Sequence, residues 1–210
     1  SVRRYKLITP MPLGIVWHYT GGVGGPKYSQ NLADRIQTYD RATDRPASWH
    51  VLIAKNGALY QSVSLFDGSW HVGRPGKIAG KDCENINRCT VGVELENAGR
   101  LKRITAKWYC WPYWEDKIAE IPEDSCEVES NRATRVQGEG YFDTFPEAQI
   151  KSALVLAKVI AEVCALSGAN MEHGHKDFDS LRKEDPGPLF RRIHLPRIIE
   201  DVLKPRSPLC

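Results

Sequence analysis

The sequence predicts a mixed α/β fold in which a single central β-sheet is flanked by helices. Short β-branched segments in the first half of the chain, a long helical periodicity near its end, and the interleaving of the two lead to this prediction. The 210 residues are 41% hydrophobic and 26% charged, which is the balance of a globular protein. We therefore expect residues 1–210 to form one domain that carries an insertion at residues 98–143.

The first expected elements are a strand and a helix. Residues 13–20 (Leu-Gly-Ile-Val-Trp-His-Tyr-Thr) have the pattern of a buried strand that ends in polar residues. The glycine-rich loop Gly21–Pro26 follows, and it lacks the Lys-Ser/Thr pair of a phosphate-binding Walker motif. From Ser29 to Asp40, apolar residues at helical spacing predict a helix with one buried face, formed by Leu32, Ile36 and Tyr39.

A β-hairpin and a further strand come next. Trp49–Ile53 and Ala58–Val63 are strand-like, and the Asn56-Gly57 dipeptide between them is typical of a tight hairpin turn. We expect His50, on the first of these strands, to be buried and hydrogen-bonded. Thr90–Leu95 (Thr-Val-Gly-Val-Glu-Leu) predicts another β-branched strand.

Two helices are expected in the last third of the chain. Thr144–Glu147 matches a capping box with a proline inside the first helical turn. The helix that follows ends near Gly168, and its apolar stripe consists of Ile150, Ala153, Leu154, Ala157, Ile160, Val163 and Cys164. His194–Leu203 predicts a short final helix.

No regular pattern is visible between Asn97 and Thr144, where an aromatic cluster comprises Trp108, Tyr109, Trp111, Tyr113 and Trp114. Such a cluster forms either a sugar-stacking wall beside a binding groove or a small satellite core pinned by a Cys110–Cys126 bridge. Cys83 and Cys89 form a second close pair. Both pairs fit local disulfides in an oxidising compartment, and equally fit reduced, buried thiols.

Charge and hydropathy exclude two kinds of partner. The net charge of +3 is small and dispersed, so we expect no nucleic-acid binding. No apolar run approaches the roughly 20 residues that cross a bilayer, so we expect no membrane span. We expect a monomer.

Three residues from distant parts of the chain have the properties of metal ligands. His175 and Asp185 bracket a loop, and Asp185 enters a Pro-Gly-Pro turn that fixes its backbone. His18 stands at the end of the first strand. Zinc needs rigidly held, deprotonated ligands at about 2.0–2.2 Å, and three protein ligands leave a position open for catalysis. Each histidine alone is more often structural, but the combination favours a zinc site.

Five ordered segments resemble one known family: Ile15–Thr20, Ser48–Ile53, Ser69–Gly73, Val91–Asn97 and Gly174–Pro188. The chain is similar to the zinc-dependent N-acetylmuramoyl-L-alanine amidases, a family that includes phage amidase-type lysozymes, cytosolic anhydromuramyl-peptide amidases and peptidoglycan recognition proteins. The resemblance implies their fold and zinc-dependent hydrolysis of the amide bond between N-acetylmuramic acid and L-alanine in bacterial peptidoglycan.

The resemblance also implies roles for single residues. His18, His175 and Asp185 match the zinc ligands, Glu94 matches a general base, and Lys183 matches a lysine that stabilises the tetrahedral oxyanion. Some relatives have cysteine as the third ligand and tyrosine at the position of Glu94, so this chain is nearer the anhydromuramyl type at its metal site. Without the zinc site, Glu94 would be a strand residue paired with a surface cation, and Lys183 a solvated loop lysine.

Four further residues are candidates for substrate contact: Tyr19, Trp70, His71 and Arg182. Trp70 and His71 either stack on or hydrogen-bond the sugar or peptide, or form a core pair that supports the sheet. Arg182 either contacts a carboxylate of the stem peptide or is a plain surface arginine. His173, two residues before His175, is a candidate for contact with the ligands rather than with the metal.

We expect the partner to be a muramyl peptide of bacterial peptidoglycan. The absence of a wall-binding repeat favours a single-domain phage endolysin that moves from the host cytoplasm to the cell wall; a secreted or periplasmic enzyme is the other possibility. An autolysin, a cytosolic recycling amidase and a non-catalytic recognition module remain alternatives. The complete set of three ligands favours an enzyme over the recognition module.

Overall fold

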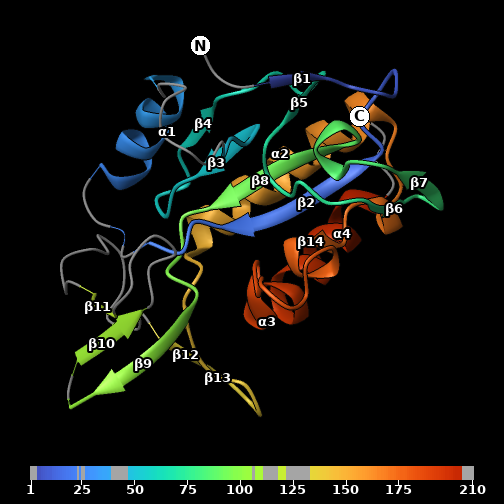
Figure 1. Ribbon diagram of the computed structural model, residues 1–210. Helices are drawn as coiled ribbons and strands as arrows, with labels where there is room; N and C mark the ends of the chain where they lie inside the picture. Colours follow the sequence, from blue (N-terminus) through green and yellow to red (C-terminus); the bar gives the residue numbers. More distant parts are fainter. Residues whose placement is uncertain are drawn as a thin grey trace, which may run out of the picture.

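The computed structural model shows a central five-stranded sheet with helices on its faces and a second five-stranded sheet at one end (Figure 1). It describes residues 4–22, 24, 27–38, 47–105, 107–110, 118–121 and 133–204. The central sheet has the strand order β14 (His173–Gly174), β2 (Gly14–Tyr19), β8 (Thr90–Leu95), β3 (Val51–Ile53) and β4 (Leu59–Gln61). Neighbouring strands run parallel except for β4, which is antiparallel to β3. The expected mixed α/β fold is confirmed.

Successive side chains of β2 and β8 point alternately to the two faces of the sheet. Ile15, Trp17, Val91 and Val93 belong to the main core, together with residues of α2 (Glu147–Cys164) and α4 (Leu195–Leu203). These two helices therefore cover one face of the sheet (Figure 1). Residues of the opposite parity, including the paired positions His18 and Glu94, point to the other face.

The other face is covered in two separate places, which leaves an open region between them. Helix α1 (Tyr28–Thr38) packs through Leu32 against Trp49 and Leu52. At the far end, Val16 packs with residues of the hairpin β6 (Gly76–Ile78) and β7 (Lys81–Cys83) and of the short 3-10 helix η1 (Ile86–Arg88). A two-stranded sheet of β1 (Arg4–Lys6) and β5 (Asp67–Ser69) completes this layer.

Most expected boundaries hold to within two residues, but the predicted capping box is wrong. Helix α2 begins at Glu147 after the N-cap residue Pro146, and no side chain caps it. The predicted cap, Thr144, pairs its hydroxyl with Thr134 Oγ1 at 2.9 Å and gives its carbonyl to Lys55 Nζ at 2.8 Å. Long-range partners therefore hold Thr144 outside the helix.

The apolar stripe of α2 is mostly correct. Ala153, Ala157, Ile160 and Cys164 are buried in the main core, with Ile150 and Leu154 partly buried against it. Val163 is wrong as a core residue because its side chain is 42% exposed. Of the expected first helix, Tyr39 and Asp40 lie outside the described residues, as do Val23, Gly25 and Pro26 of the expected glycine loop.

The segment without a visible pattern forms the second sheet, which the sequence did not predict. Its antiparallel strand order is β11 (Ala119–Glu120), β10 (Lys107–Cys110), β9 (Arg100–Ile104), β13 (Gly140–Asp143) and β12 (Ala133–Val136). The first residues of β9 are Arg-Leu-Lys-Arg, so charged side chains obscure the alternation that identifies a strand.

A small core under this sheet contains Leu101, Cys110 and Ile121, with Trp108 packed against it. The Trp108 and Tyr141 rings lie 5.0 Å apart. These contacts favour the satellite-core interpretation of the insertion for its described part. Trp111, Tyr113, Trp114 and Cys126 lie outside the described residues, so the expected Cys110–Cys126 bridge stays a prediction.

A buried ion pair connects the two sheets where β8 ends. Lys55 Nζ contacts Asp143 Oδ1 at 2.8 Å, and the other oxygen of Asp143 accepts the Ala98 N–H at 2.7 Å. Asn97 Nδ2 donates to the Asp143 carbonyl at 3.0 Å. Because an uncompensated buried charge costs about 3–5 kcal/mol, this arrangement fixes the start of the second sheet beside the central one.

Two further expectations have an outcome. Cys83 and Cys89 form a disulfide, which closes a short loop between β7 and β8. In the described part of the chain, no helix combines the length and the apolar character needed to span a bilayer.

Candidate metal centre and active-site cleft

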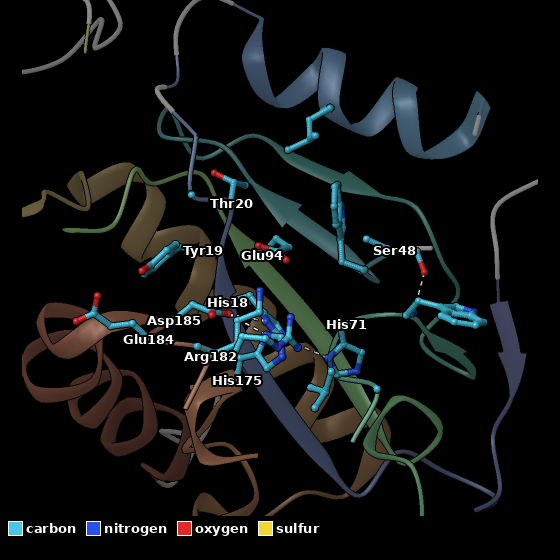
Figure 2. Close-up of a pocket in the computed structure, with 18 of the residues that line it drawn as sticks. His18, Tyr19, Thr20, Ser48, His71, Glu94, His175, Arg182, Glu184 and Asp185 are labelled. Atoms are coloured by element: carbon cyan, nitrogen blue, oxygen red, sulfur yellow. Dashed lines mark hydrogen bonds and ion pairs between the residues drawn. The ribbon is translucent and has the colours of Figure 1, made fainter. Parts of the chain in front are cut away.

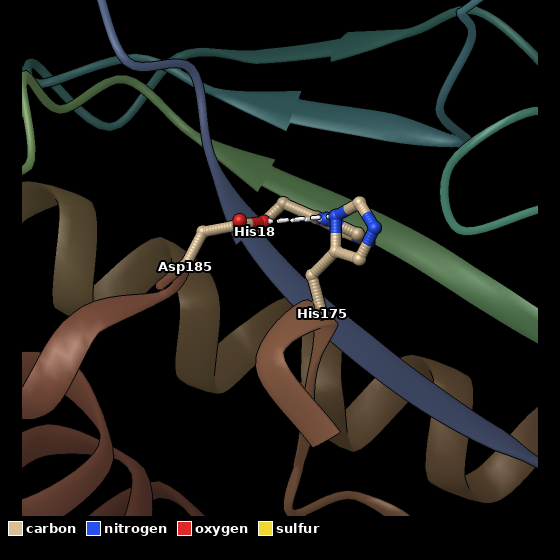
Figure 3. A group of neighbouring side chains, drawn as sticks. All are labelled: His18, His175 and Asp185. Atoms are coloured by element: carbon tan, nitrogen blue, oxygen red, sulfur yellow. Dashed lines mark hydrogen bonds and ion pairs between the residues drawn. The ribbon is translucent and has the colours of Figure 1, made fainter. Parts of the chain in front are cut away.

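His18, His175 and Asp185 converge in the structure as the sequence predicts (Figure 3). One ligand atom from each lies within 4.8 Å of the other two. His18 Nδ1 is 2.9 Å and His175 Nδ1 is 3.2 Å from Asp185 Oδ2. All three are buried, with exposures of 1%, 5% and 6%. Two imidazole nitrogens and a carboxylate oxygen at this spacing are a donor set that fits a divalent ion such as zinc.

The pairing of β14 with β2 explains how the two histidines meet. His173 is in register with Val16 and Gly174 with Trp17, so the residue after Gly174 arrives beside His18 at the strand ends. Gly174 permits Asp185 to approach, because a Cβ atom at residue 174 would lie 2.4 Å from Pro186 Cδ. The Lys176 N–H also donates to the Asp185 carbonyl at 3.2 Å. The glycine before His175 therefore lets the Asp185-Pro186 turn pack against the strand.

Electrostatics keep these side chains in the protonation states that metal ligands need. Burial lowers the pKa of His18 to about 4, although its hydrogen bond to Asp185 acts in the opposite direction. For Asp185, burial raises the pKa, but hydrogen bonds to His175 and His18 outweigh it and bring the pKa below its usual range. At neutral pH the site therefore offers a neutral imidazole at His18 and an ionised carboxylate at Asp185.

Glu94 lies next to this centre on the neighbouring strand. It is in register with His18 and faces the same side of the sheet (Figure 2). Its Oε2 atom is buried and has no hydrogen-bond partner among the residues that the structure describes. Burial, followed by the negative charge of Asp185, raises its pKa to about 8, while Lys183 acts in the opposite direction. A carboxylate with raised proton affinity beside a metal site has the properties of a general base.

A cleft of about 600 Å³ opens above these groups. Besides the three metal-site residues and Glu94, the cleft is lined by Tyr19, Trp70, His71, Arg182 and Lys183. The further candidate His173 does not line the cleft, and its ring lies 5.7 Å from that of Phe178. Arg182 donates to Asp179 Oδ2 from Nε at 2.9 Å and from Nη2 at 2.6 Å, while half of its side chain stays exposed. Burial raises the pKa of Tyr19 well above its ordinary value, so its phenol stays neutral.

Comparison with known families agrees with this geometry. The family described as N-acetylmuramoyl-L-alanine amidase matches residues 9–188, which include every residue named above as a site candidate. The chain belongs to this family.

Individual members of the amidase family are distant in sequence. The N-acetylmuramoyl-L-alanine amidase AmiD of Escherichia coli strain K12 is 28% identical over 155 residues, which is 70% of this chain and 43% of AmiD. The solved complex of AmiD with anhydro-N-acetylmuramic acid-L-Ala-D-gamma-Glu-L-Lys has a TM-score of 0.53 at 25% identity and covers 94% of this chain and 58% of that one. This chain thus spans about half the length of AmiD.

Other solved structures show the same fold. A selenomethionine derivative of AmpD has a TM-score of 0.57 at 20% identity, covering 90% of this chain and 85% of that chain. A mutant endolysin from Bacillus subtilis has a TM-score of 0.54 at 19% identity, covering 96% of this chain and 94% of that chain. At these identities the likeness shows a shared fold.

Sequence reasoning missed the residues that hold His71 in the amidase site. Asn87 Oδ1 accepts the backbone N–H groups of His71, Val72 and Gly73 at 3.0, 2.6 and 3.0 Å. The Thr90 hydroxyl contacts His71 Nε2 at 3.2 Å. The pair Asn85 and Asn87 in a short loop is a signal for side-chain-to-backbone hydrogen bonds, but it does not reveal which distant segment receives them.

The second sheet reaches the amidase cleft at one edge. Ala98 and Arg100 line the cleft, and the Arg100 guanidinium pairs with Glu184, the residue before Asp185. Arg100 also lies over the Phe142 ring, 4.7 Å from its centroid. The sequence did not predict this link between the inserted segment and the metal-site loop.

Proposed function

We propose that this chain is a zinc-dependent amidase that hydrolyses the bond between N-acetylmuramic acid and L-alanine in bacterial peptidoglycan. The observation that carries the proposal is the buried group of His18, His175 and Asp185 with Glu94 beside it, at the base of a cleft of about 600 Å³. Membership of the amidase family supports the same reaction.

In this proposal His18, His175 and Asp185, which lie at the wall of the cleft, would hold the zinc ion. Bound zinc supplies Lewis acidity, which makes water nucleophilic at neutral pH and polarises an amide carbonyl. The protein's contribution is to keep the His18 imidazole neutral, the Asp185 carboxylate ionised and all three side chains fixed before substrate arrives.

Glu94 acts as the general base and acid. Its buried Oε2, which has no hydrogen-bond partner in the described part of the chain, takes a proton from the attacking water. It then delivers this proton to the alanine nitrogen as the amide bond breaks. A raised pKa favours this double role because the same group must accept and release a proton near neutral pH.

Lys183 and the other cleft residues act on the substrate. The Lys183 ammonium stabilises the negative charge that develops on the carbonyl oxygen, a contribution of the kind worth roughly 2.7–4 kcal/mol elsewhere. Tyr19, Trp70 and Arg182 position the muramyl peptide along the cleft. We propose peptidoglycan as the partner of this surface.

Activity on purified cell wall tests the proposal. Protein loaded with zinc is incubated with intact sacculi and, separately, with soluble anhydromuramyl peptide, and release of free L-alanine-terminated peptide is measured with and without a chelator. We expect chelator-sensitive release. Release from sacculi supports an endolysin or autolysin, and release from the soluble substrate alone supports a recycling enzyme. Binding to sacculi without release from either substrate contradicts the amidase and supports a recognition module.

A further inference from the structure

We propose that His71 is a positioning residue that fixes the tautomer and ring orientation of His18, so that His18 presents Nδ1 to the metal ion. This inference rests on the proposed metal site. His71 lies between two contacts. Its Nδ1 is 3.0 Å from His18 Nε2 (Figure 2). Its Nε2 is 3.2 Å from Thr90 Oγ1.

The contact at Thr90 determines which atoms donate and which accept along this series of hydrogen bonds. Thr90 has one hydroxyl hydrogen, and it donates that hydrogen to the Ile86 carbonyl at 2.8 Å. Toward His71, Thr90 is therefore an acceptor, and His71 carries its proton on Nε2. His71 Nδ1 is then an acceptor in turn, and it receives the N–H of His18 Nε2.

This direction leaves the Nδ1 lone pair of His18 pointing at Asp185 Oδ2, 2.9 Å away. Two lone pairs at that distance repel each other unless a proton or a metal ion lies near both. An ion bound by His18, His175 and Asp185 meets this requirement. The hydrogen-bond chain from Ile86 through Thr90 and His71 therefore selects the tautomer of His18 that can bind a metal through Nδ1.

The surroundings of His71 fit a positioning role better than substrate contact. Both ring nitrogens are engaged, and the residue is only 8% exposed. Its backbone is held by Asn87 Oδ1, and Asn87 lies within the loop that the Cys83–Cys89 disulfide closes. Gly92 provides the space for its ring, because a Cβ atom there would lie 2.6 Å from His71 Cγ.

The neighbouring His50 does not share this role. The two rings are 6.1 Å apart, and His50 uses both nitrogens elsewhere: Nδ1 accepts the Gly92 N–H at 2.8 Å, and Nε2 contacts the Asp67 carbonyl at 2.8 Å. His50 is buried and hydrogen-bonded, as the sequence predicts. Of the two histidines, His71 is the one that contacts a metal-site residue.

Two substitutions of His71 separate the hydrogen bond from the packing. In His71→Asn the amide oxygen lies near the place of Nδ1 and still accepts from His18, whereas in His71→Gln the amide lies near Nε2 and serves only Thr90. Loss of such an outer partner typically weakens metal binding about 10–100-fold. We expect a loss in this range for His71→Gln and less than tenfold for His71→Asn, measured as zinc Kd by competition with a chelator.

If the His71 variants fold poorly, two more conservative substitutions of Thr90 test the same hydrogen bonds. Thr90→Val removes the acceptor at the end of the chain with little change in volume, and Thr90→Ser retains it. We expect weaker zinc binding for Thr90→Val than for Thr90→Ser, with a smaller loss than for His71→Gln. Thermal unfolding of the metal-free proteins shows whether any variant has changed its fold.

Nitrogen NMR of the imidazoles in the zinc-loaded wild type tests the tautomers directly. We expect protonated Nε2 on both His71 and His18, with Nδ1 of His71 unprotonated. An Nδ1-protonated His71, unchanged zinc Kd in both His71→Gln and Thr90→Val, or equal losses in His71→Asn and His71→Gln overturn the positioning role. Failure of the wild type itself to bind zinc overturns the proposed metal site instead, so the two failures are distinguishable.

Discussion

The two five-stranded sheets of this protein differ in what their strands carry. In the central sheet, β2 and β8 are buried along nearly their whole length, and their polar residues of one parity, His18 and Glu94, meet in the cleft. In the second sheet, β9 alternates poorly and exposes Arg100, Lys102 and Arg103. His18 and Glu94 are therefore held on buried strands, whereas the exposed sheet reaches the cleft only at its edge among the residues described.

The largest effect is expected when the His18 side chain is removed from the central sheet. We expect His18→Ala to abolish zinc binding and amide hydrolysis together, because two remaining ligands and a cavity do not hold the ion in a catalytic geometry. Zinc content by atomic absorption and release of peptide from cell wall measure the two effects. His173→Ala is the matched control, since His173 faces Phe178 at a ring distance of 5.7 Å, and it should retain zinc. Zinc loss in the control alone would place the ligand at residue 173.

The next largest effect is expected on the neighbouring strand. Glu94→Gln keeps the shape of the side chain but removes its ability to accept a proton, so turnover should fall by about 10²–10⁴-fold. Zinc binding should persist because Glu94 is not among the ligands. Measuring kcat and zinc content on the same preparation separates the roles, and a variant with full kcat would remove Glu94 from the mechanism.

Lys183 tests the loop that brings Asp185 to the central sheet. Lys183→Met preserves the length of the side chain without its charge, and we expect kcat to fall about 10²–10³-fold, the range for removing one donor to a developing oxyanion. KM and zinc content should change little. A large rise in KM with constant kcat would instead identify Lys183 as a group that binds the ground-state substrate.

The central sheet and the convergence of His18, His175 and Asp185 were the most predictable part of the molecule. Residues 13–20 and 90–95 are continuous apolar segments whose local pattern suffices to identify buried strands. The loop between His175 and Asp185, the Pro-Gly-Pro turn after Asp185 and five ordered segments of family resemblance predicted the three residues that the structure brings together. The parallel pairing of β14 with β2, which the structure shows and the sequence did not predict, brings His175 beside His18.

The second sheet and the partners of His71 were not predictable for different physical reasons. The strands of residues 100–143 are short and held by pairing with one another and by the buried Lys55–Asp143 pair, so their local sequence carries little strand signal. Thr90 and His71 are in contact in the folded protein although they lie 19 residues apart in the sequence. Val163 was misassigned because helical periodicity indicates a face but not how far the neighbouring element extends over it.

The buried His50 predicts how the stability of the central sheet depends on pH. Burial lowers the pKa of His50 to about 4 from 6.5, so the unfolded chain takes up the proton first as pH falls. His50 therefore adds stability above pH 6.5 that is lost between pH 6.5 and 4, with a slope of at most about 1.4 kcal/mol per pH unit. When a chelator keeps both proteins free of metal, His50→Gln should show a shallower pH dependence of the unfolding free energy than wild type. Identical slopes would mean that His50 is not neutral in the folded protein.

The smallest effect is expected where the second sheet meets the cleft. Arg100 pairs with Glu184, but nearly half of its side chain is exposed, and such surface pairs are worth about 0–1 kcal/mol. We expect Arg100→Gln to change kcat/KM about twofold to fivefold, which is the kinetic equivalent of that energy, and to leave zinc affinity unaltered. A loss above about 100-fold exceeds what a screened ion pair supplies. In that case Arg100 must contact the substrate or hold the loop of Asp185 in place, and the second sheet would belong to the catalytic machinery.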